Sequence, residues 1–495
     1  MRALHSMVLA LAGLLIPMIA QANTYYVSTT GSDGNPGTLT QPWRTIQKAC
    51  NMLTPGDTVQ IRAGTYAEKV QVNVSGSAGG GWVTIENYPG EHVIVNAYGL
   101  HSRSEIQSIG SDNVFLIQDK NYIQISGLEI ENNSTSGDPT YVDGSLIRIY
   151  GSGDHIAILG NTLHHTRGHD SMAITVYGTE ANTPVSNLSI DNNLIYDCTP
   201  AHSETLTLNG NVENFDITGN TLHNVNNIGI DMIGGDTSIG PPNGPNATRF
   251  GVCQWNTVSY CHSSYDDAAA GIYVDGGHDI VINNNTSFFN DEGLEVGAEI
   301  HGVTAYNVTV RDNMIYRNTV YGIVFGGYDA NSTGSVQNCQ FLNNTCYQND
   351  THSNGNGEMA VQYHASNNVI RNNLFCATRQ NLLISWDPNN TASTNNALDY
   401  NLYYCPGGAG NAQFGWEDHA YTGYASYLAG TGQDPHSLFA NPLFAAPATY
   451  NLHLTANSPA VNRGDPNFVP ATGEVDIDGD PRVMGGRVDI GMDEY

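Results

Sequence analysis

Short runs of apolar residues, mostly β-branched or aromatic, alternate with asparagine-containing turns from about residue 121 onward. In chain order the repeats are IAILGNTL, LSIDNNLI, FDITGNTL, GVCQWNTV, IVINNNTS, VTVRDNMI, CQFLNNTC, NVIRNNLF and ALDYNLYY. The repeated asparagines are Asn161, Asn193, Asn220, Asn256, Asn285, Asn313, Asn344, Asn373 and Asn401. They are separated by 32, 27, 36, 29, 28, 31, 29 and 28 residues.

A period near 30 residues with short strands predicts an all-β fold, a parallel β-helix. Each turn of such a solenoid buries its apolar face only by stacking on its neighbours. Asparagine suits a fixed corner, because its amide can bond to the asparagine one rung above or below and it tolerates turn conformations. A β-sandwich would need hairpin turns about every 8 to 12 residues, and the sequence lacks them.

Both ends of the chain differ from the repeated middle. QPWRTIQKACNMLTPGD places Trp43, Ile46, Ala49, Cys50 and Leu53 at helical spacing, which predicts an amphipathic helix capping the N-terminal end of the coil. The last segment lacks the asparagine repeat and is rich in Gly and Pro, which predicts an irregular C-terminal cap. The expected divisions are an N-terminal cap with the first coils over 23–120, the β-helix over 121–405 and the C-terminal cap over 406–495.

The first residues predict export. Arg2, an apolar run over 7–20 and small residues at Ala20 and Ala22 form the pattern of a secretory signal peptide over 1–22. That run is too short to span a bilayer, and no later stretch is apolar for long enough. We therefore expect a secreted, monomeric protein without membrane insertion. Because the chain ends at Tyr495 without a hydrophobic tail, we expect release rather than anchoring.

Charge and cysteine content narrow the function classes. The formal net charge of −30 argues against nucleic acid as a partner, and it would repel a polyanionic substrate unless a cation were bound. The eight cysteines are irregularly spaced without a C-x-x-C pair. We expect buried small residues with one or two disulfides at most, and no cysteine zinc site.

Alternation along the second strand of each repeat predicts two columns of outward side chains. One column runs Arg148, Thr175, Thr207, Asp231, Tyr273, Glu295, Val324 and Ala360. The next contains Tyr150, Tyr177, Asn209, Asp275, Gly297, Gly326 and Gln362, and beyond it lie Glu299, Tyr328 and His364. Because rungs are about 4.8 Å apart, the four carboxylates among these residues should gather within two rungs.

This gathering predicts a carbohydrate site. Tyrosine faces stack on sugar rings while carboxylates act on hydroxyls, metals or the glycosidic oxygen. The expected substrate-binding residues are Arg148, Tyr150, Tyr177 and Gln362. The long excursion over 234–250 is expected to form a wall of the groove.

Several other acidic residues are less clearly placed. Asp266 and Asp267 could join the acidic patch, whereas Asp291 is expected in a corner outside it. The direction of Glu358 is ambiguous. The DIDGDP stretch around Asp476 favours a structural turn over half of a calcium loop, since no distant bidentate glutamate follows it.

Two N-terminal stretches carry a family resemblance. TYYVSTTGSDGNPGTLTQPWRTIQKA and PGDTVQIRAGTYAEKV resemble the entry of right-handed parallel β-helix proteins of the pectate-lyase-like superfamily, which includes calcium-dependent pectate lyases, alginate lyases and chondroitinase B. The closing DIDGDPR and VDIGMDEY resemble the C-terminal segments of exported bacterial β-helix proteins. The resemblance implies a right-handed coil and an enzyme that cleaves a polysaccharide. Many such lyases use a lysine base, but the only lysines here, Lys48, Lys69 and Lys120, precede the repeats.

Three interpretations of the acidic patch remain open. In a calcium-assisted polysaccharide lyase, Asp231, Asp275, Glu295 and Glu299 would hold Ca²⁺, and the base would be Tyr273, Tyr328 or His364. In a glycoside hydrolase, Asp275 would pair with Asp231 or Glu295 as catalytic carboxylates. In a non-catalytic exported β-helix that binds glycan, the same acids would be ordinary surface residues.

Overall fold

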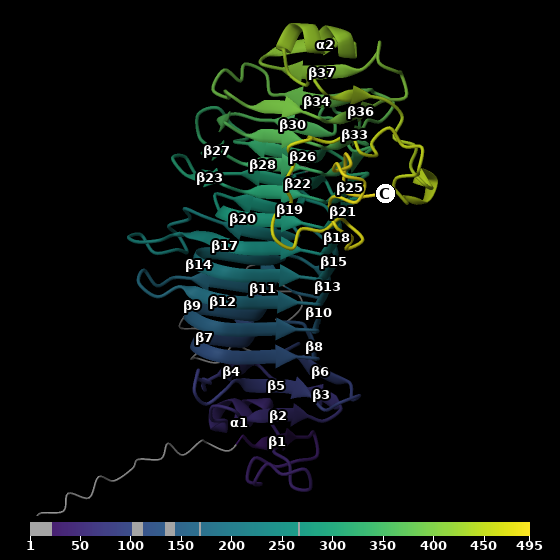
Figure 1. Ribbon diagram of the computed structural model, residues 1–495. Coiled ribbons are helices and arrows are strands. Elements are labelled where there is room, and N and C mark those ends of the chain that lie inside the picture. Colours follow the sequence, from purple (N-terminus) through teal and green to yellow (C-terminus); the bar gives the residue numbers. More distant parts are fainter. Residues whose placement is uncertain (1–21, 101–111, 134–143, 168–169, 266–267) are drawn as a thin grey trace, which may run out of the picture.

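The computed structural model describes residues 22–100, 112–133, 144–167, 170–265 and 268–495, which form a long coil of stacked parallel strands (Figure 1). The predicted signal peptide lies outside the described residues except for Ala22. The described helices include α1 (Ile46–Met52), α2 (Tyr424–Thr431) and a 3-10 turn, η2 (Pro447–Thr449). Among the described residues, no helix has the length and apolar character needed to cross a bilayer. The predicted parallel β-helix is confirmed.

One sheet contains 13 strands and runs the length of the coil. Its strands are β3 (Gly64–Tyr66), β6 (Val93–Asn96), β8 (Glu129–Glu131), β10 (Thr162–His164), β13 (Leu194–Cys198), β15 (Thr221–Val225), β18 (Thr257–Cys261), β21 (Thr286–Phe288), β25 (Met314–Tyr316), β29 (Thr345–Tyr347), β33 (Leu374–Cys376), β36 (Leu402–Tyr404) and β39 (Leu438–Phe439). We call it the corner sheet.

A second sheet of 26 strands bends into two faces, which three long strands share: β7 (Asp112–Ser126), β9 (Gly144–Leu159) and β14 (Leu206–Thr218). We call one face the site face. It also contains β4 (Val70–Val72), β11 (Ser171–Gly178), β16 (Ile230–Ile233), β19 (Ala270–Asp275), β22 (Glu292–Gly297), β26 (Tyr321–Gly326), β30 (Met359–Val361), β34 (Leu382–Trp386), β37 (Gln413–Trp416) and β38 (His419–Thr422). The other face contains β1 (Thr24–Val27), β2 (Thr58–Ile61), β5 (Val83–Asn87), β12 (Val185–Asp191), β17 (Ala247–Gln254), β20 (His278–Asn283), β23 (Thr304–Tyr306), β24 (Thr309–Arg311), β27 (Ser335–Gln337), β28 (Gln340–Leu342), β31 (Ala365–Ser366), β32 (Val369–Arg371) and β35 (Ala397–Asp399).

The register predicted for the site face is confirmed. Successive ladder partners are Arg148, Thr175, Thr207, Asp231, Tyr273, Glu295, Val324 and Ala360. The apolar residues between them face inward and form one continuous core along the coil. Because a one-residue slip would turn every apolar side chain outward, burial of this core holds the register.

The predicted asparagine ladder is confirmed at atomic detail. From Asn161 to Asn373, each backbone N–H and each side-chain amide donates to the Oδ1 of the next asparagine at 2.9–3.2 Å. The ladder ends where Asn401 Nδ2 donates to Asp434 Oδ1 at 3.0 Å. A shorter ladder at another corner ends on Glu358, whose carboxylate accepts from Asn349, so Glu358 points inward.

Replacing Asn285 by alanine is expected to destabilise the coil by about 2–4 kcal/mol, because buried hydrogen-bonding groups on both adjacent rungs lose their partners. Its Oδ1 accepts from Asn256, and its amide donates to Asn313 and to the Cys253 carbonyl. Chemical denaturation measures the loss. Asn354→Ala is the control, since Asn354 is exposed; equal midpoints for the two variants would contradict a stabilising ladder.

The eight cysteines are buried free thiols, as expected for small core residues. The C-terminal segment turns back along the flank of the coil after β39 (Figure 1). It is fixed there by an ion pair from Arg482 to Asp312 and by the Met492 N–H donating to Thr345 Oγ1. In DIDGDP, Asp476 Oδ1 accepts the N–H groups of Asp478 and Asp480 at 2.9 and 2.8 Å, which is the contact pattern of a structural turn.

Candidate active site

Two adjoining cavities open where β16, β19, β22 and β26 cross the site face. The smaller, of about 180 Å³, is lined by His202, Glu204, Asn227, Ile228, Asp231, Ser263, Tyr265, Ala268, Asp275 and Glu299. The larger, of about 530 Å³, is lined by Ile228, Ala268, Tyr273, Glu292, Glu295, Glu299, Val320, Tyr321, Tyr328 and Gln362. They share Ile228, Ala268 and Glu299, so a chain-like ligand could occupy both.

The predicted acids converge on these cavities. Asp231 on β16, Tyr273 on β19 and Glu295 on β22 occupy the same column on three successive rungs. Asp275 ends β19, and its Oδ1 accepts the Glu299 backbone N–H at 2.6 Å. Asp231 and Asp275 are only 2% and 6% exposed. They are therefore buried acids and not ordinary solvated surface residues.

Two further acids were missed from the sequence. Glu204 lies in the smaller cavity, just before β14 begins. Because it is outside a strand, alternation does not predict the direction of its side chain. Glu292 begins β22 and lines the larger cavity. It has the same parity as the inward Leu294, so alternation predicts it to point into the core. A glutamate at a position predicted to face the apolar core is unusual, and this signal could have identified Glu292 as a functional residue.

Burial and mutual repulsion raise the pKa values of these carboxyls. The pKa of Asp231 is raised well above its usual range by burial and then by Glu204, Asp275 and Glu299. That of Asp275 is raised by burial and then by Glu299, and that of Glu204 is raised to about 7, chiefly by burial. Such shifts are expected of a cluster that takes up protons or a cation.

A second acidic group occupies the larger cavity. Burial first, and then the charge of Glu292 and a hydrogen bond with it, raise the pKa of Glu295. A carboxyl pair of this kind favours retention of one proton. The phenol of Tyr273 is also kept protonated, because burial and then Glu295 raise its pKa. Its hydroxyl lies 2.8 Å from where a Cβ at Gly297 would stand, so a glycine on the next rung leaves room for it.

The acidic side chains of the two cavities would attract a cation, and they must draw closer together to ligate one, because among the described residues no three of them have oxygens within 4.8 Å of one another. No lysine or arginine is among their described lining residues, and Asp231 Oδ1 is buried without a hydrogen-bond partner in the described part of the chain. Carboxylate oxygens are the ligands that Ca²⁺ prefers. Of the four predicted calcium ligands, Asp231, Asp275 and Glu299 line the smaller cavity, whereas Glu295 lines the larger one. Asp266 and Asp267 lie outside the described residues.

Aromatic rings flank the acids. Tyr265 stacks on His202 with ring centroids 3.9 Å apart and lines the smaller cavity. Tyr328 lines the larger cavity and is 58% exposed. Exposed rings of this kind can stack on sugar faces. Tyr265 was not predicted, because it lies in a loop rather than in a strand column.

Other predicted residues lie elsewhere. Arg148 is 1% exposed, and its guanidinium lies 5.0 Å from the ring centroid of Tyr177. It stands three rungs from Asp231, or about 14 Å, and Tyr150 pairs with Tyr177 on the same rungs. Within the described part of the chain, His364 makes no hydrogen bond to an acid of the cavities. Its Nε2 instead lies 2.9 Å from the Ala330 carbonyl oxygen. Gln362 is the exception among the predicted substrate-binding residues, because it lines the larger cavity.

The prediction that 234–250 forms a wall of the groove is wrong for these two cavities. None of its residues lines either one; the wall of the smaller cavity comes instead from Ser263, Tyr265 and Ala268. The excursion contributes charge, since Asp236 helps to raise the pKa values of Glu204 and Asp275. An insertion length shows that a loop leaves the coil but not the direction in which it folds.

Comparison with known proteins supports the fold and identifies relatives. The family described as "Pel9A-like, right handed beta helix region" matches residues 25–149. The uncharacterized protein YwoF of Bacillus subtilis is 36% identical over 448 residues, covering 88% of this chain and 91% of YwoF. Pectate lyase PEL9 of Emericella nidulans is 34% identical over 124 residues, covering 24% of this chain and 30% of PEL9.

Among solved structures, the pectate lyase Pel9A aligns over 97% of this chain and 98% of its own, with 16% identity and a TM-score of 0.45. The relationship to YwoF extends over nearly the whole of both chains, and the Pel9A-like match agrees with the coil that the strands form. The chain therefore belongs to the family of YwoF, and it is a parallel β-helix protein with a Pel9A-like segment over residues 25–149.

Proposed function

We propose that this protein is a secreted enzyme that cleaves a uronate-containing polysaccharide across the two cavities by calcium-assisted β-elimination. The observation that carries the proposal is the convergence of Glu204, Asp231, Asp275 and Glu299 in one cavity whose described lining contains no lysine or arginine. The 34% identity to a pectate lyase over part of the chain supports the substrate class. The signal-peptide pattern at the N-terminus supports export.

A cation is needed to bring a polyuronate to a protein of net charge −30. Asp231, Asp275 and Glu299 would hold Ca²⁺, and the unpartnered Asp231 Oδ1 fits a metal-ligating oxygen. Calcium bound there would neutralise the substrate carboxylate and so acidify the proton on the adjacent carbon. The protein's own residues then handle orientation and proton transfer.

Tyr265 and Tyr328 orient the sugar chain by stacking on its rings. Glu204, whose pKa is raised to about 7 by burial, accepts the proton from the carbon, because a base that titrates near neutral pH is effective in its ionised form. Tyr273 donates its phenolic proton to the departing glycosidic oxygen, consistent with a pKa raised by burial. The carbon–oxygen bond breaks as the carbon–carbon double bond forms.

A glycoside hydrolase is the second candidate, favoured by the Glu292–Glu295 pair. Burial, followed by the charge of Glu292 and a hydrogen bond with it, favours the protonated form of Glu295, which is the form needed to protonate a glycosidic oxygen. Asp275, in the adjacent column and one rung away, would then serve as nucleophile or base. A lyase and a hydrolase leave different products, so one assay distinguishes them.

Incubating the secreted protein with polyuronates and neutral glycans, with and without a chelator, tests both candidates. We expect new reducing ends together with ultraviolet absorbance of an unsaturated product. Chelation should abolish both signals and added Ca²⁺ should restore them. Reducing ends without absorbance, unaffected by the chelator, would reject the lyase in favour of the hydrolase. No cleavage of any glycan would contradict both and favour the non-catalytic interpretation.

A further inference from the structure

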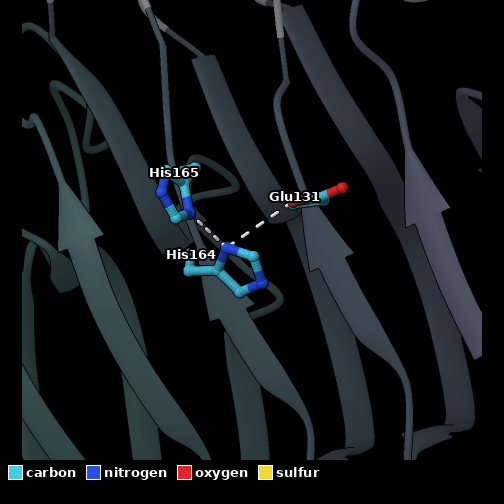
Figure 2. A group of neighbouring side chains, drawn as sticks. All are labelled: Glu131, His164 and His165. Atoms are coloured by element: carbon cyan, nitrogen blue, oxygen red, sulfur yellow. Dashed lines mark hydrogen bonds and ion pairs between the residues drawn. The ribbon is translucent and has the colours of Figure 1, made fainter. Parts of the chain in front are cut away.

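A second group of potential metal ligands lies on the corner sheet, away from the acidic cavities. Glu131 ends β8 and His164 ends β10, where the two are ladder partners, and His165 follows directly. Figure 2 shows the three side chains turned toward one another. His164 Nδ1 lies 2.5 Å from His165 Nδ1 and 3.7 Å from Glu131 Oε2, and one ligand atom of each lies within 4.8 Å of the others.

The bend at the end of the strand brings two consecutive histidines together. In a continuing strand, neighbouring side chains would point to opposite faces. His165 instead adopts the left-handed conformation with φ of 54°, which redirects its ring toward that of His164. Asn132 and Asp197 adopt the same conformation at the same corner of adjacent rungs, so the bend is a regular feature of the coil. Among the described rungs, only this one places two consecutive histidines at the bend, which makes it a potential metal site.

Each imidazole has a carboxylate behind it. His164 Nε2 lies 3.2 Å from Glu129 Oε1, and His165 Nε2 lies 3.8 Å from Asp197 Oδ2. Both rings therefore direct Nδ1 toward the shared centre and Nε2 toward an acid. Metal-ligating histidines are oriented in this way by carboxylate partners, which also make the ligating nitrogen more basic.

The remaining ligand atoms are also held in place. Asn96 Nδ2 donates to Glu131 Oε1 at 2.6 Å, which leaves Oε2 directed at His164. The His164 side chain is 6% exposed and stacks on Tyr196 with ring centroids 4.7 Å apart. Tyr196 in turn stacks on His223 at 5.4 Å. The buried ring is thus fixed before any ligand arrives, while the half-exposed His165 ring can turn.

We propose that Glu131, His164 and His165 bind a divalent transition-metal ion. Two imidazole nitrogens with one carboxylate oxygen suit Zn²⁺, Co²⁺, Ni²⁺ or Cu²⁺ better than Ca²⁺. An ion about 2.0–2.1 Å from each nitrogen requires the rings to part slightly, which the exposed His165 allows. The ion links successive rungs of the corner sheet and stabilises the coil, because it binds the folded state alone.

This metal site is separate from the cavities on the site face, so the metal-binding proposal and the proposed enzymatic function can be tested independently. The competing explanation is a simple hydrogen bond between the two imidazoles, which needs no metal. A further cluster on the C-terminal segment, His453, Asp478 and Asp493, has a single imidazole. His453 Nε2 lies 3.0 Å from Asp478 Oδ2, so His453→Ala is a matched control for non-specific histidine loss.

Zn²⁺ titration of the full-length, chelator-treated protein against a chromophoric chelator tests the proposal. We expect one tightly bound equivalent that His165→Ala and Glu131→Gln each weaken by about 10-fold or more and that His453→Ala preserves. Co²⁺ should give the visible absorption of imidazole coordination in the wild type and not in His165→Ala. Thermal unfolding without metal checks that each variant is folded.

Zn²⁺ should also raise the unfolding midpoint of the wild type but not of His165→Ala. No saturable binding, or equal binding by the wild type and His165→Ala, would overturn the proposal. Loss of binding in His453→Ala with retention in His165→Ala would place the ion in the C-terminal cluster instead.

Discussion

The Asp231→Asn variant is expected to lose polysaccharide cleavage by about 10²–10⁴-fold while keeping its fold. Asp231 is the most buried acid of the smaller cavity, and its Oδ1 has no partner among the described residues. The amide cannot supply the negative charge that cation binding requires. The initial rate of product formation at saturating Ca²⁺ measures the loss, and circular dichroism confirms the coil.

The control for this experiment is His364→Asn. His364 contacts the Ala330 carbonyl rather than the cavity acids, and asparagine tolerates its left-handed φ of 60°. We expect nearly wild-type activity. Similar activity in Asp231→Asn and the wild type, or an equal loss in His364→Asn, would show that cleavage occurs elsewhere on the molecule.

Raising the pH from about 5 to about 8 in the absence of Ca²⁺ should lower the thermal midpoint by about 5 °C. The pKa values of Asp231, Asp275 and Glu295 are raised by burial, and that of Glu204 is raised to about 7. Because the folded state then holds more protons than the unfolded state, stability is greatest below the unfolded pKa values. It decreases as the pH rises through the folded ones.

Ca²⁺ should restore the lost stability at the higher pH, and Asp231→Asn should remove part of the pH dependence because one repelling carboxylate is gone. Differential scanning calorimetry with and without a chelator measures both effects. A midpoint that rises steadily with pH, or one that Ca²⁺ leaves unchanged in the wild type, would contradict a cluster of repelling carboxylates. We therefore expect Asp231→Asn to be more stable than the wild type at the higher pH, because active sites often trade folding stability for activity.

The fold and its register could be predicted from the asparagine period. Each asparagine bonds to the next, so the spacing that the sequence displays is the spacing of the rungs themselves. Strand alternation then placed Asp231, Tyr273 and Glu295 in one column. These inferences succeeded because each depends on a regular backbone whose geometry is the same on every turn.

The parts of the site that escaped prediction lie where that regularity ends. Glu204 and Tyr265 come from turns between strands, and Glu292 stands at a strand start with inward parity. The corner histidines were missed for a related reason, since alternation predicts that His164 and His165 diverge, whereas the left-handed residue makes them converge. Loop direction depends on tertiary contacts that the periodic pattern does not encode.

A crystal structure of the Glu204→Gln variant, which lacks the proposed base, grown with Ca²⁺ and a short oligogalacturonate tests the central claim most directly. The variant keeps Asp231, Asp275 and Glu299 while slowing turnover. The sugar is expected to cross both cavities against Tyr265 and Tyr328, with Ca²⁺ held by Asp231 and Asp275. Sugar bound on another face, with neither ligand in the cavities, would contradict the assignment of these acids as the active site.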